Sequence, residues 1–144
     1  MGAERNAQMV RSAYRAFSAG DTEALVAMFA EDAVWHVSGH GGLAGTKLGR
    51  TEILGYFGEL FQRSAGTLEL SLHDVVGGDD HTVGLHENSA RRAGNILRQR
   101  VVLVVHFRNE LFTEVWEFHE DQAQYDAFWG DEDHWNRERV HPRS

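Results

Sequence analysis

Residues 13–39, AYRAFSAGDTEALVAMFAEDAVWHVSG, decide the fold class of this 144-residue chain. Tyr14 and Phe17 lie three residues apart, and Val10 lies one turn before Tyr14. This spacing places the three side chains on one face of a helix, because a helix repeats every 3.6 residues. We therefore predict a first helix over residues 3–19.

A break and a second helix follow directly. Gly20 has the backbone freedom that ends a helix, and Asp21 is a typical N-cap whose carboxylate accepts hydrogen bonds from free amides. The apolar residues after it predict a second helix over residues 21–30. An aromatic strand then begins, and we predict it over residues 33–38.

The rest of the chain contains two more helical segments and a run of hairpins. Apolar residues with helical spacing predict a helix over residues 50–63, after the glycine-rich loop 39–49. Alternating apolar residues and short turns predict the strands, which cover residues 68–72, 81–92, 95–108 and 111–118. A short helix over 121–129 precedes a polar tail over 131–144. The expected organisation is one domain over residues 1–130 with a C-terminal tail.

Composition narrows the function classes. The formal charge of −8 disfavours nucleic acid as a partner, and the chain has no apolar run long enough to cross a membrane. The first residues lack the apolar segment of a signal peptide, so we expect a cytoplasmic protein. The chain has no cysteine, which removes thiolate chemistry and disulfides. The histidines show no metal-site spacing, and we expect neither a metal nor a cofactor.

Two tight turns predict which side chains share a face of the sheet. Two-residue loops at Ala93–Gly94 and Asn109–Glu110 pair His86 with Val101 and Leu103 with Trp116. Glu87 then lies opposite Arg100, and this charged pair marks the outer face. The predicted inner face holds Gly84, His86, Asn88, Gln99, Val101, Leu103, Val105, Glu114, Trp116 and Phe118. A β-bulge anywhere would shift part of this assignment by one residue.

Several polar residues on an otherwise apolar inner face predict a small-molecule pocket, because buried polar groups are costly without partners. We expect His86, Asn88 and Glu114 to be the catalytic residues: His86 as base or acid, Asn88 as a donor, and Glu114 as an acid. The alternatives are a structural histidine and a surface carboxylate. The expected ligand-binding residues are Tyr14, Trp35, Phe57, Phe61, His73, Gln99, Leu103, Trp116, Phe118 and Trp129.

Two of these residues depend on local geometry. A four-residue loop at residues 77–80 would place His73 on the inner face, whereas a loop of odd length would place Leu70 and Leu72 there and His73 outside. Trp35 is expected to point inward with Val37, either as a pocket wall or as core.

Four segments carry a resemblance to a known family: DAVWHVSG (32–39), LAGTKLGRTEILGYF (43–57), LHDVVGGDDHTVGLHENSARRAGN (72–95) and TEVWEFHEDQAQYDAFW (113–129). In this order the chain resembles the SnoaL-like polyketide cyclases of the nuclear transport factor 2-like, ketosteroid-isomerase-like superfamily. The resemblance implies an α+β fold in which a cone-shaped, curved mixed sheet wraps around the N-terminal helices and encloses a pocket, a cystatin-like α+β roll.

The family's catalytic residues do not align with equivalent residues here. The ketosteroid isomerase base aligns with Val37, and the oxyanion-binding tyrosine aligns with Ala13, one residue before Tyr14. The cyclase aspartate of the last strand aligns with Phe118, and Asp121 is the nearest following acid. The resemblance therefore implies the fold rather than either known mechanism.

The sequence leaves three functional hypotheses. The first is a cofactor-free isomerase, cyclase or hydrolase that acts on a small hydrophobic or carbonyl-bearing molecule. The second is a non-catalytic binder of such a molecule, and the third is a structural dimer module with a filled cavity. We also expect a homodimer through the outer face, where Val102, Val104 and Val115 would form an apolar patch. The alternative is that residues 121–129 cover this patch.

Overall fold

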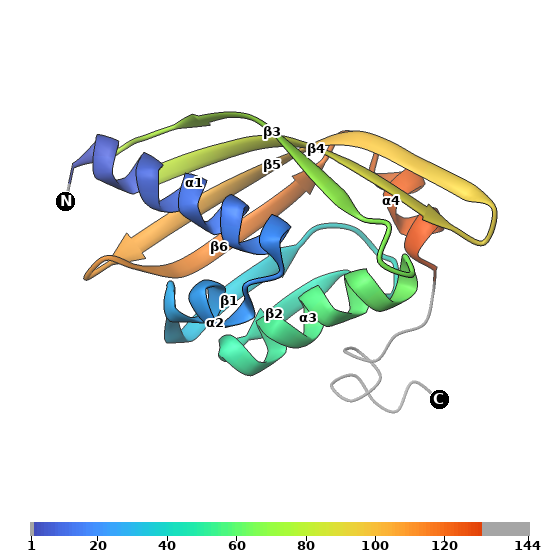
Figure 1. The fold of residues 1–144 in the computed structure, drawn as a ribbon, viewed down its shortest axis with the longest axis horizontal. Helices are drawn as coiled ribbons and strands as arrows, with labels where there is room; N and C mark the ends of the chain where they lie inside the picture. The colour runs from blue at the N-terminus through green and yellow to red at the C-terminus, as the bar shows by residue number, and fades with distance from the viewer. Residues whose placement is uncertain (1, 131–144) are drawn as a thin grey trace.

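The computed structural model describes residues 2–130 as a six-stranded sheet with its helices on one side (Figure 1). The predicted tail over 131–144 lies outside the described residues. The helices are α1 (Ala3–Ala19), α2 (Thr22–Ala27), α3 (Gly49–Arg63) and α4 (Gln122–Trp129). The strands are β1 (Phe29–Val37), β2 (Gly45–Leu48), β3 (Glu69–Val76), β4 (His81–Arg92), β5 (Asn95–Arg108) and β6 (Leu111–His119).

The strands follow the order β2-β1-β6-β5-β4-β3. β1 and β6 are parallel, and every other neighbouring pair is antiparallel, so the sheet is mixed. Helices α1, α2 and α3 lie against its concave side, as Figure 1 shows. This arrangement is the α+β roll that the sequence predicts. Among residues 2–130, no helix combines the length and apolar character needed to cross a lipid bilayer.

The first helices form for the reasons visible in the sequence. Gly20 adopts the left-handed conformation with φ 71° and ends α1, and the Asp21 carboxylate accepts a hydrogen bond from Ala24 N at the start of α2. β1 begins at Phe29, earlier than predicted. β2 was not predicted, because it is a four-residue edge strand inside the glycine-rich segment.

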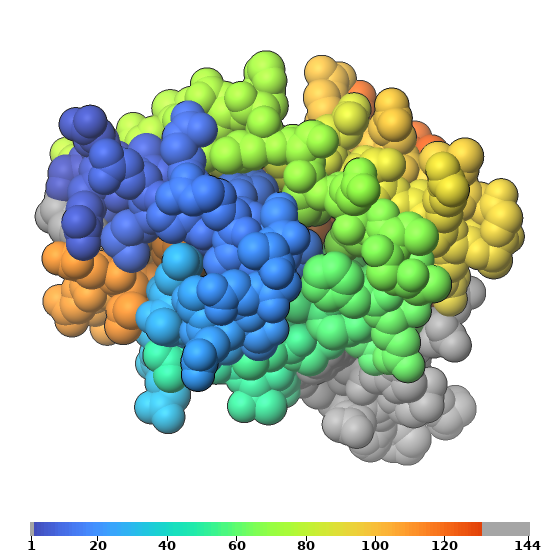
Figure 2. Space-filling view, viewed as in Figure 1, coloured from blue at the N-terminus to red at the C-terminus, as the bar shows by residue number. Residues whose placement is uncertain are grey.

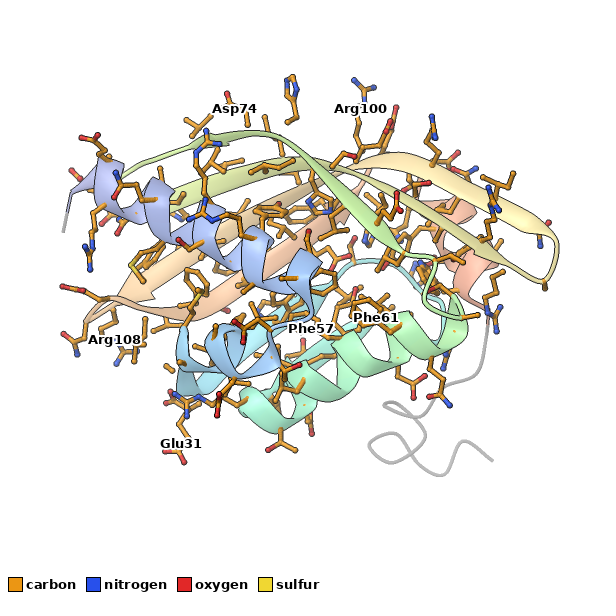
Figure 3. The ribbon with its side chains drawn as sticks, viewed as in Figure 1. Glu31, Phe57, Phe61, Asp74, Arg100 and Arg108 are labelled. Carbon is orange, nitrogen blue, oxygen red and sulfur yellow. The ribbon has the colours of Figure 1, made fainter. Side chains whose placement is uncertain are left out.

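Both predicted two-residue turns are present. Arg92 pairs with Asn95, and Arg108 pairs with Leu111. Ala93, Asn109 and Glu110 all have positive φ, the conformation that lets a two-residue turn follow the twist of its strands. His86 therefore pairs with Val101 and Glu87 with Arg100, as predicted. Figure 3 shows Arg100 pointing away from the helices, on the outer face.

A β-bulge changes which side chains of β6 point toward the helices. His106 pairs with Glu114 while Phe107 pairs with Phe112, so Thr113 is an extra residue on β6. The predicted pairing of Leu103 with Trp116 is therefore wrong, and Leu103 pairs with Glu117 instead. After the bulge, the inward-facing and outward-facing residues of β6 are exchanged.

The bulge corrects four residue assignments. Glu114, Trp116 and Phe118 lie on the outer face, and Phe118 is 48% exposed. Val115, predicted outside, is buried in the core together with Phe112. Val115 and Glu117 face inward in place of Glu114, Trp116 and Phe118, and Glu117 is only 6% exposed.

A second irregularity places His73 outside. Leu72 pairs with His86 and Asp74 pairs with Leu85, so His73 is the unpaired extra residue, and it is exposed. The prediction of His73 as a pocket residue is therefore wrong. Leu70 and Leu72 face inward, which is the other alternative that the sequence left open.

Candidate functional site

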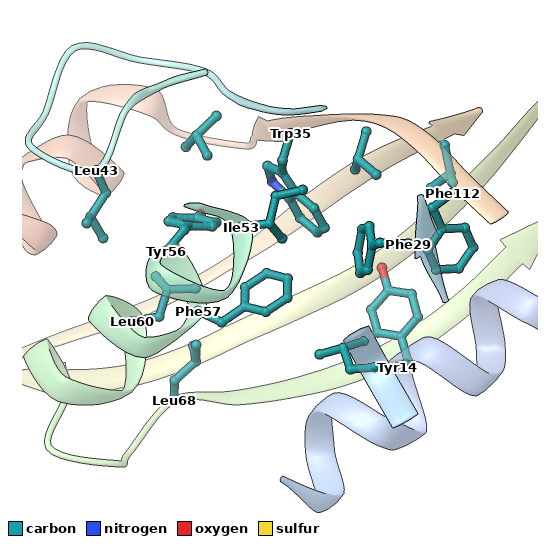
Figure 4. Close-up of a cluster of buried hydrophobic side chains, with 14 of the residues drawn as sticks. Tyr14, Phe29, Trp35, Leu43, Ile53, Tyr56, Phe57, Leu60, Leu68 and Phe112 are labelled. Carbon is teal, nitrogen blue, oxygen red and sulfur yellow. The ribbon is translucent and has the colours of Figure 1, made fainter. Parts of the chain in front are cut away.

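An apolar cavity of about 80 Å³ lies between the concave face of the sheet and α1–α3. In the same measure one water needs roughly 10–15 Å³, so this cavity has room for a small ring. Its walls combine aromatic and aliphatic side chains, and Figure 4 shows several of the aromatic rings near Tyr14. The aromatic wall residues are Phe17, Phe29, Trp35, Phe57 and Phe112. The polar lining residues are Tyr14, Tyr56, His86, Asn88, Glu117 and Tyr125.

At one end of the cavity, Tyr14, His86 and Asn88 form a hydrogen-bonded chain. His86 Nδ1 lies 2.7 Å from the Tyr14 hydroxyl, and His86 Nε2 lies 2.9 Å from Asn88 Oδ1. The Asn88 oxygen can only accept, so His86 carries its proton on Nε2 and accepts the Tyr14 hydroxyl proton at Nδ1. Burial lowers the pKa of His86 to about 4, which keeps the imidazole neutral at pH 7.

This chain leaves one hydrogen-bond donor free. Asn88 is 5% exposed, and its Nδ2 donates to no other residue among those described. Gly84 provides the space for the chain, because a Cβ at that position would lie 2.7 Å from the Tyr14 hydroxyl oxygen. Burial and the charge of Glu117 raise the pKa of Tyr14, so its hydroxyl stays protonated.

At the other end of the cavity, the Glu117 carboxylate accepts four hydrogen bonds. Oε1 accepts from Trp35 Nε1 at 2.9 Å and from the Tyr56 hydroxyl at 2.8 Å. Oε2 lies 2.7 Å from His119 Nε2 and 3.2 Å from the Tyr125 hydroxyl. The donors come from β1, α3, α4 and β6, so four elements converge on one carboxylate.

Glu117 is ionised despite its burial. Burial by itself raises the pKa of a carboxyl group, but the hydrogen bond and charge of His119, with the bonds from Trp35 and Tyr56, lower it to about 2. The same negative charge and burial raise the pKa of Tyr56 and Tyr125 well above 10, so both hydroxyls remain donors.

Gly84, beside which the Tyr14 hydroxyl lies, is in the same row of the sheet as Glu117. Gly84 pairs with Leu103, and Leu103 pairs with Glu117. Since neighbouring strands are about 4.8 Å apart, Gly84 and Glu117 are roughly 10 Å apart, with the Leu103 side chain between them. Asn88 lies four residues farther along β4, where it pairs with Gln99, and it lines the same cavity as Glu117.

A groove on the helical side adjoins this cavity. It lies between the C-terminal end of α1 and α3, where the blue and green surfaces meet in Figure 2. Phe17, Leu25 and Phe57 line both the groove and the cavity. Phe61 closes the outer side by stacking on Phe17 with ring centroids 5.3 Å apart, and Figure 3 shows Phe57 and Phe61 on the same side of α3.

The structure gathers part of the predicted ligand-binding set. The cavity lining contains Tyr14, Trp35, Phe57, His86, Asn88 and Leu103. Phe61 is 38% exposed in the groove, Gln99 is buried against Gln124 at 2.7 Å, and Trp129 is core, so these three do not line the cavity. Among the described residues, no group of three His, Asp or Glu side chains could hold a metal ion.

Sequence reasoning missed Glu117, Tyr56, Tyr125 and His119. Strict alternation assigns Glu117 and His119 to the outer face, and only the bulge at Thr113 turns them inward. Tyr56 follows Ile53 by three residues on α3, so helical periodicity could have identified it as buried. Tyr125 lies three residues before Phe128 and four before Trp129, which is also helical spacing, and all three are buried on α4.

Fold and site together define an α+β roll with a small, mainly apolar pocket lined by two clusters of polar groups. A model of the SnoaL-like domain family matches residues 10–115. The chain belongs to this family.

Relatives support the same assignment. The uncharacterized protein Rv0034 of Mycobacterium tuberculosis is 31% identical over 122 residues, which covers 84% of this chain and 93% of that protein. Bal32a, from a soil-derived mobile gene cassette, is 36% identical with a TM-score of 0.86 over 88% of this chain and 98% of that one. A Xanthomonas campestris protein with a cystatin-like fold is 28% identical, with a TM-score of 0.81 over 85% and 96% of the two chains.

Proposed function

We propose that this protein is a cofactor-free acid–base enzyme of the isomerase or cyclase type, acting on a small, neutral, carbonyl-bearing ring. One observation carries the proposal: an ionised carboxylate, Glu117, lines a cavity that is otherwise mainly apolar. A buried charge is costly to keep, and such groups are concentrated at functional sites. The aromatic walls suit a flat ligand, and no Lys or Arg lines the cavity among residues 2–130, which disfavours an anion.

Each polar group has a role in this proposal. Glu117 takes a proton from a carbon beside the ligand carbonyl, and the free Asn88 Nδ2 donates to the carbonyl oxygen as negative charge develops there. His86 holds Asn88 in place, since both of its ring nitrogens are engaged. A direct catalytic role for His86 stays a prediction.

The pKa of Glu117 restricts the substrate. A general base works best when its pKa is near the working pH, and the pKa of Glu117 is about 2. Such a weak base suits a substrate whose proton is already acidic, such as one on a carbon flanked by two carbonyl groups. The proposed substrate class is therefore an activated cyclic ketone.

The second candidate function is a binder without catalysis. It is favoured by the four donors on Glu117, which leave little capacity on either oxygen for a substrate proton. The cavity counts against the third hypothesis, a structural module whose interior is filled.

Exchange of α-hydrogens in D2O separates the two candidates. We expect the wild-type protein to bind 2-acetylcyclohexanone, a neutral cyclic ketone with a carbon flanked by two carbonyl groups, and to accelerate deuteration at that carbon as followed by NMR. Glu117→Gln should abolish the acceleration, whereas Glu114→Gln, the same change on the outer face, should retain it. Binding with no acceleration would leave the binder, and no binding of any cyclic ketone would contradict both.

We also propose a homodimer through the outer sheet face. Val115 is not part of the patch, but Val102 pairs with Phe118 and Val104 with Trp116, so these two aromatic residues join the apolar surface in its place. α4 does not cover this face, because its Tyr125 reaches the cavity on the inner side. A two-fold dimer is the commonest closed arrangement for such a patch.

Sedimentation velocity tests the dimer. The wild-type protein should sediment as a dimer at micromolar concentration, and Val104→Glu should dissociate it. Phe61→Glu, the same kind of change on the helical side, should leave the dimer intact. A monomeric wild-type protein would contradict the proposal.

A further inference from the structure

His119 lies behind Glu117 and has an oxygen next to each ring nitrogen. Nε2 is 2.7 Å from Glu117 Oε2, and Nδ1 is 3.1 Å from Gln122 Oε1. The side chain is 0% exposed, and the ring stacks on Tyr125 with centroids 3.4 Å apart and planes at 12°. Both ring nitrogens of His119 therefore have hydrogen-bond partners within the protein.

The orientation of the Gln122 amide is fixed by its other contacts. Its Nε2 donates to Ser38 O at 3.2 Å and to Asp126 Oδ1 at 3.1 Å, and both of these atoms only accept. Oε1 is therefore the atom directed at His119. The Ser38 hydroxyl donates to this same oxygen at 2.6 Å, which uses its single proton.

His119 Nδ1 must consequently carry a hydrogen. Its neighbours are Gln122 Oε1 and, at 3.2 Å, Ser38 Oγ, and neither has a proton left to donate to it. One more proton lies between His119 Nε2 and Glu117 Oε2. The other donors on Glu117, from Trp35, Tyr56 and Tyr125, favour the ionised carboxylate and so assign this proton to the histidine.

We infer that His119 is a positioning residue for Glu117: it holds protons on both ring nitrogens and keeps the carboxylate ionised and fixed at the pocket wall. The inference rests on the proposed function, in which Glu117 is the base. His119 contacts Glu117 and not the cavity, so it acts through the carboxylate.

Neighbouring residues hold the Gln122 carbonyl in position as the acceptor for His119 Nδ1. Gly39 has φ 111°, and a Cβ there would lie 2.2 Å from Gln122 Nε2 and 2.4 Å from Asp126 Oδ1. Gly39 thus allows Gln122 to dock, and Asp126 Oδ2 accepts a further hydrogen bond from His40 N at 2.9 Å. The sequence of contacts runs from Asp126 through Gln122 and His119 to Glu117.

Other titratable groups surround the pair. Tyr56 of α3 and Tyr125 of α4 contact Glu117, and Asp126 of α4 lies beyond Gln122. His86 of β4 is close enough for the charges of Glu117 and His119 to affect its pKa in opposite directions. Lys47 of β2 lies 5.3 Å from the centre of the Tyr56 ring.

The test is an NMR titration of the full chain without ligand. At pH 7 the ¹⁵N shifts should show protons on both nitrogens of His119 and on only one nitrogen of His86. The ¹³C titration of the Glu117 carboxyl should move upward by about one to three pH units in His119→Gln, the range that an opposite charge exerts. A single proton on His119, or an unchanged Glu117 titration in this variant, would overturn the inference.

Two further variants keep the test decisive. His36→Gln makes the same change at the outer pair, where His36 Nε2 lies 2.6 Å from Glu114 Oε2, and should leave the Glu117 titration unchanged. If His119→Gln does not fold, Gln122→Leu keeps the histidine but removes the acceptor at Nδ1, together with the Gln122 bonds to Ser38 and Asp126, and should shift the titration of Glu117 upward by a smaller amount. No shift in that folded variant would also overturn the inference.

The outcome is separable from that of the proposed function, because the titration needs no substrate. In the deuterium exchange assay, the acidic limb of the pH profile should move upward in His119→Gln by the same amount as the carboxyl titration. Loss of exchange in Glu117→Gln together with an unchanged profile in His119→Gln would retain the proposed function and reject the role of His119.

Discussion

A buried histidine belongs to each polar cluster of the pocket, His86 in the lining and His119 behind Glu117, and the two histidines differ in the atoms that surround them. His86 has one donor and one acceptor: the Tyr14 hydroxyl at Nδ1 and Asn88 Oδ1 at Nε2. His119 has only acceptors, the Glu117 carboxylate and the Gln122 carbonyl. The first environment suits a neutral imidazole and the second suits an imidazolium.

The difference shows that burial does not determine charge by itself. Burial disfavours charge at both ends, and at His86 it outweighs the opposing effects of the Glu117 charge and the Asn88 hydrogen bond, so the pKa of His86 falls to about 4. At Glu117, the partners outweigh burial, and the carboxyl pKa also falls, to about 2. The pocket thus has a neutral polar end and a charged end within one apolar enclosure.

The largest effect on stability should follow removal of the Glu117 carboxylate. Glu117→Leu leaves His119 and the Tyr56 hydroxyl buried without their acceptor, and we expect a loss of about 3–5 kcal/mol in urea unfolding. Glu114→Leu, at a pair whose side chains are 32% and 37% exposed, should cost less than about 1 kcal/mol. The double variant Glu117→Leu/His119→Leu should recover part of the loss. Equal costs for the two single variants would show that the Glu117 end is not a buried ion pair.

The free energy of unfolding should depend on pH through His86, which is neutral in the folded protein. The pKa of His86 is about 4 when folded and 6.5 as a free group, so between these values the unfolded chain binds more protons. This contribution to stability is fully present above pH 6.5 and is lost as the pH falls toward 4. Glu117 titrates at lower pH. Its contribution to stability is present above pH 4.5 and is lost as the pH falls toward 2.

Unfolding at two pH values measures the contribution of His86. From pH 7 to pH 5 the wild-type protein should lose about 2 kcal/mol more than His86→Leu, because one pKa unit corresponds to about 1.4 kcal/mol. Parallel losses in the two proteins would mean that His86 is protonated in the folded state, and the contrast between the ends would disappear.

The smallest effect on stability should follow removal of the Tyr14 hydroxyl, the last member of the hydrogen-bonded chain with His86 and Asn88. Tyr14→Phe removes the donor to His86 Nδ1 and should cost about 1 kcal/mol in urea unfolding. In a His86→Leu background the same change should cost close to nothing, which a double-mutant cycle will show. Additive costs would place the Tyr14 hydroxyl outside the chain.

Local patterns predicted most of the fold. The spacing of apolar residues located α1, α2 and α3, and the turns at Ala93–Gly94 and Asn109–Glu110 gave the correct pairing of β4 with β5. Both signals depend on neighbours in the sequence, and no distant contact alters them here. His86, Asn88 and Trp35 were placed at the cavity for this reason.

The charged end could not be predicted in the same way. The two-residue turn at Asn109–Glu110, followed by strict alternation along β6, places Trp116 and Phe118 on the inner face. The extra residue Thr113 reverses this, and nothing in the local pattern marks it as a bulge. His73 was misplaced as a candidate for the same physical reason, since it is the extra residue on β3.

The bulge at Thr113 also makes the chemistry of this fold sensitive to a single insertion or deletion. A deletion that removed the extra residue would rotate the rest of β6 by one position, exchanging Glu117 with Trp116 and Phe118. The pocket would gain aromatic surface and lose its carboxylate, while the outer face would gain charge where the apolar patch now lies. A change of one residue in length could thus turn a charged pocket into a purely apolar one and, at the same step, alter the surface available for self-association.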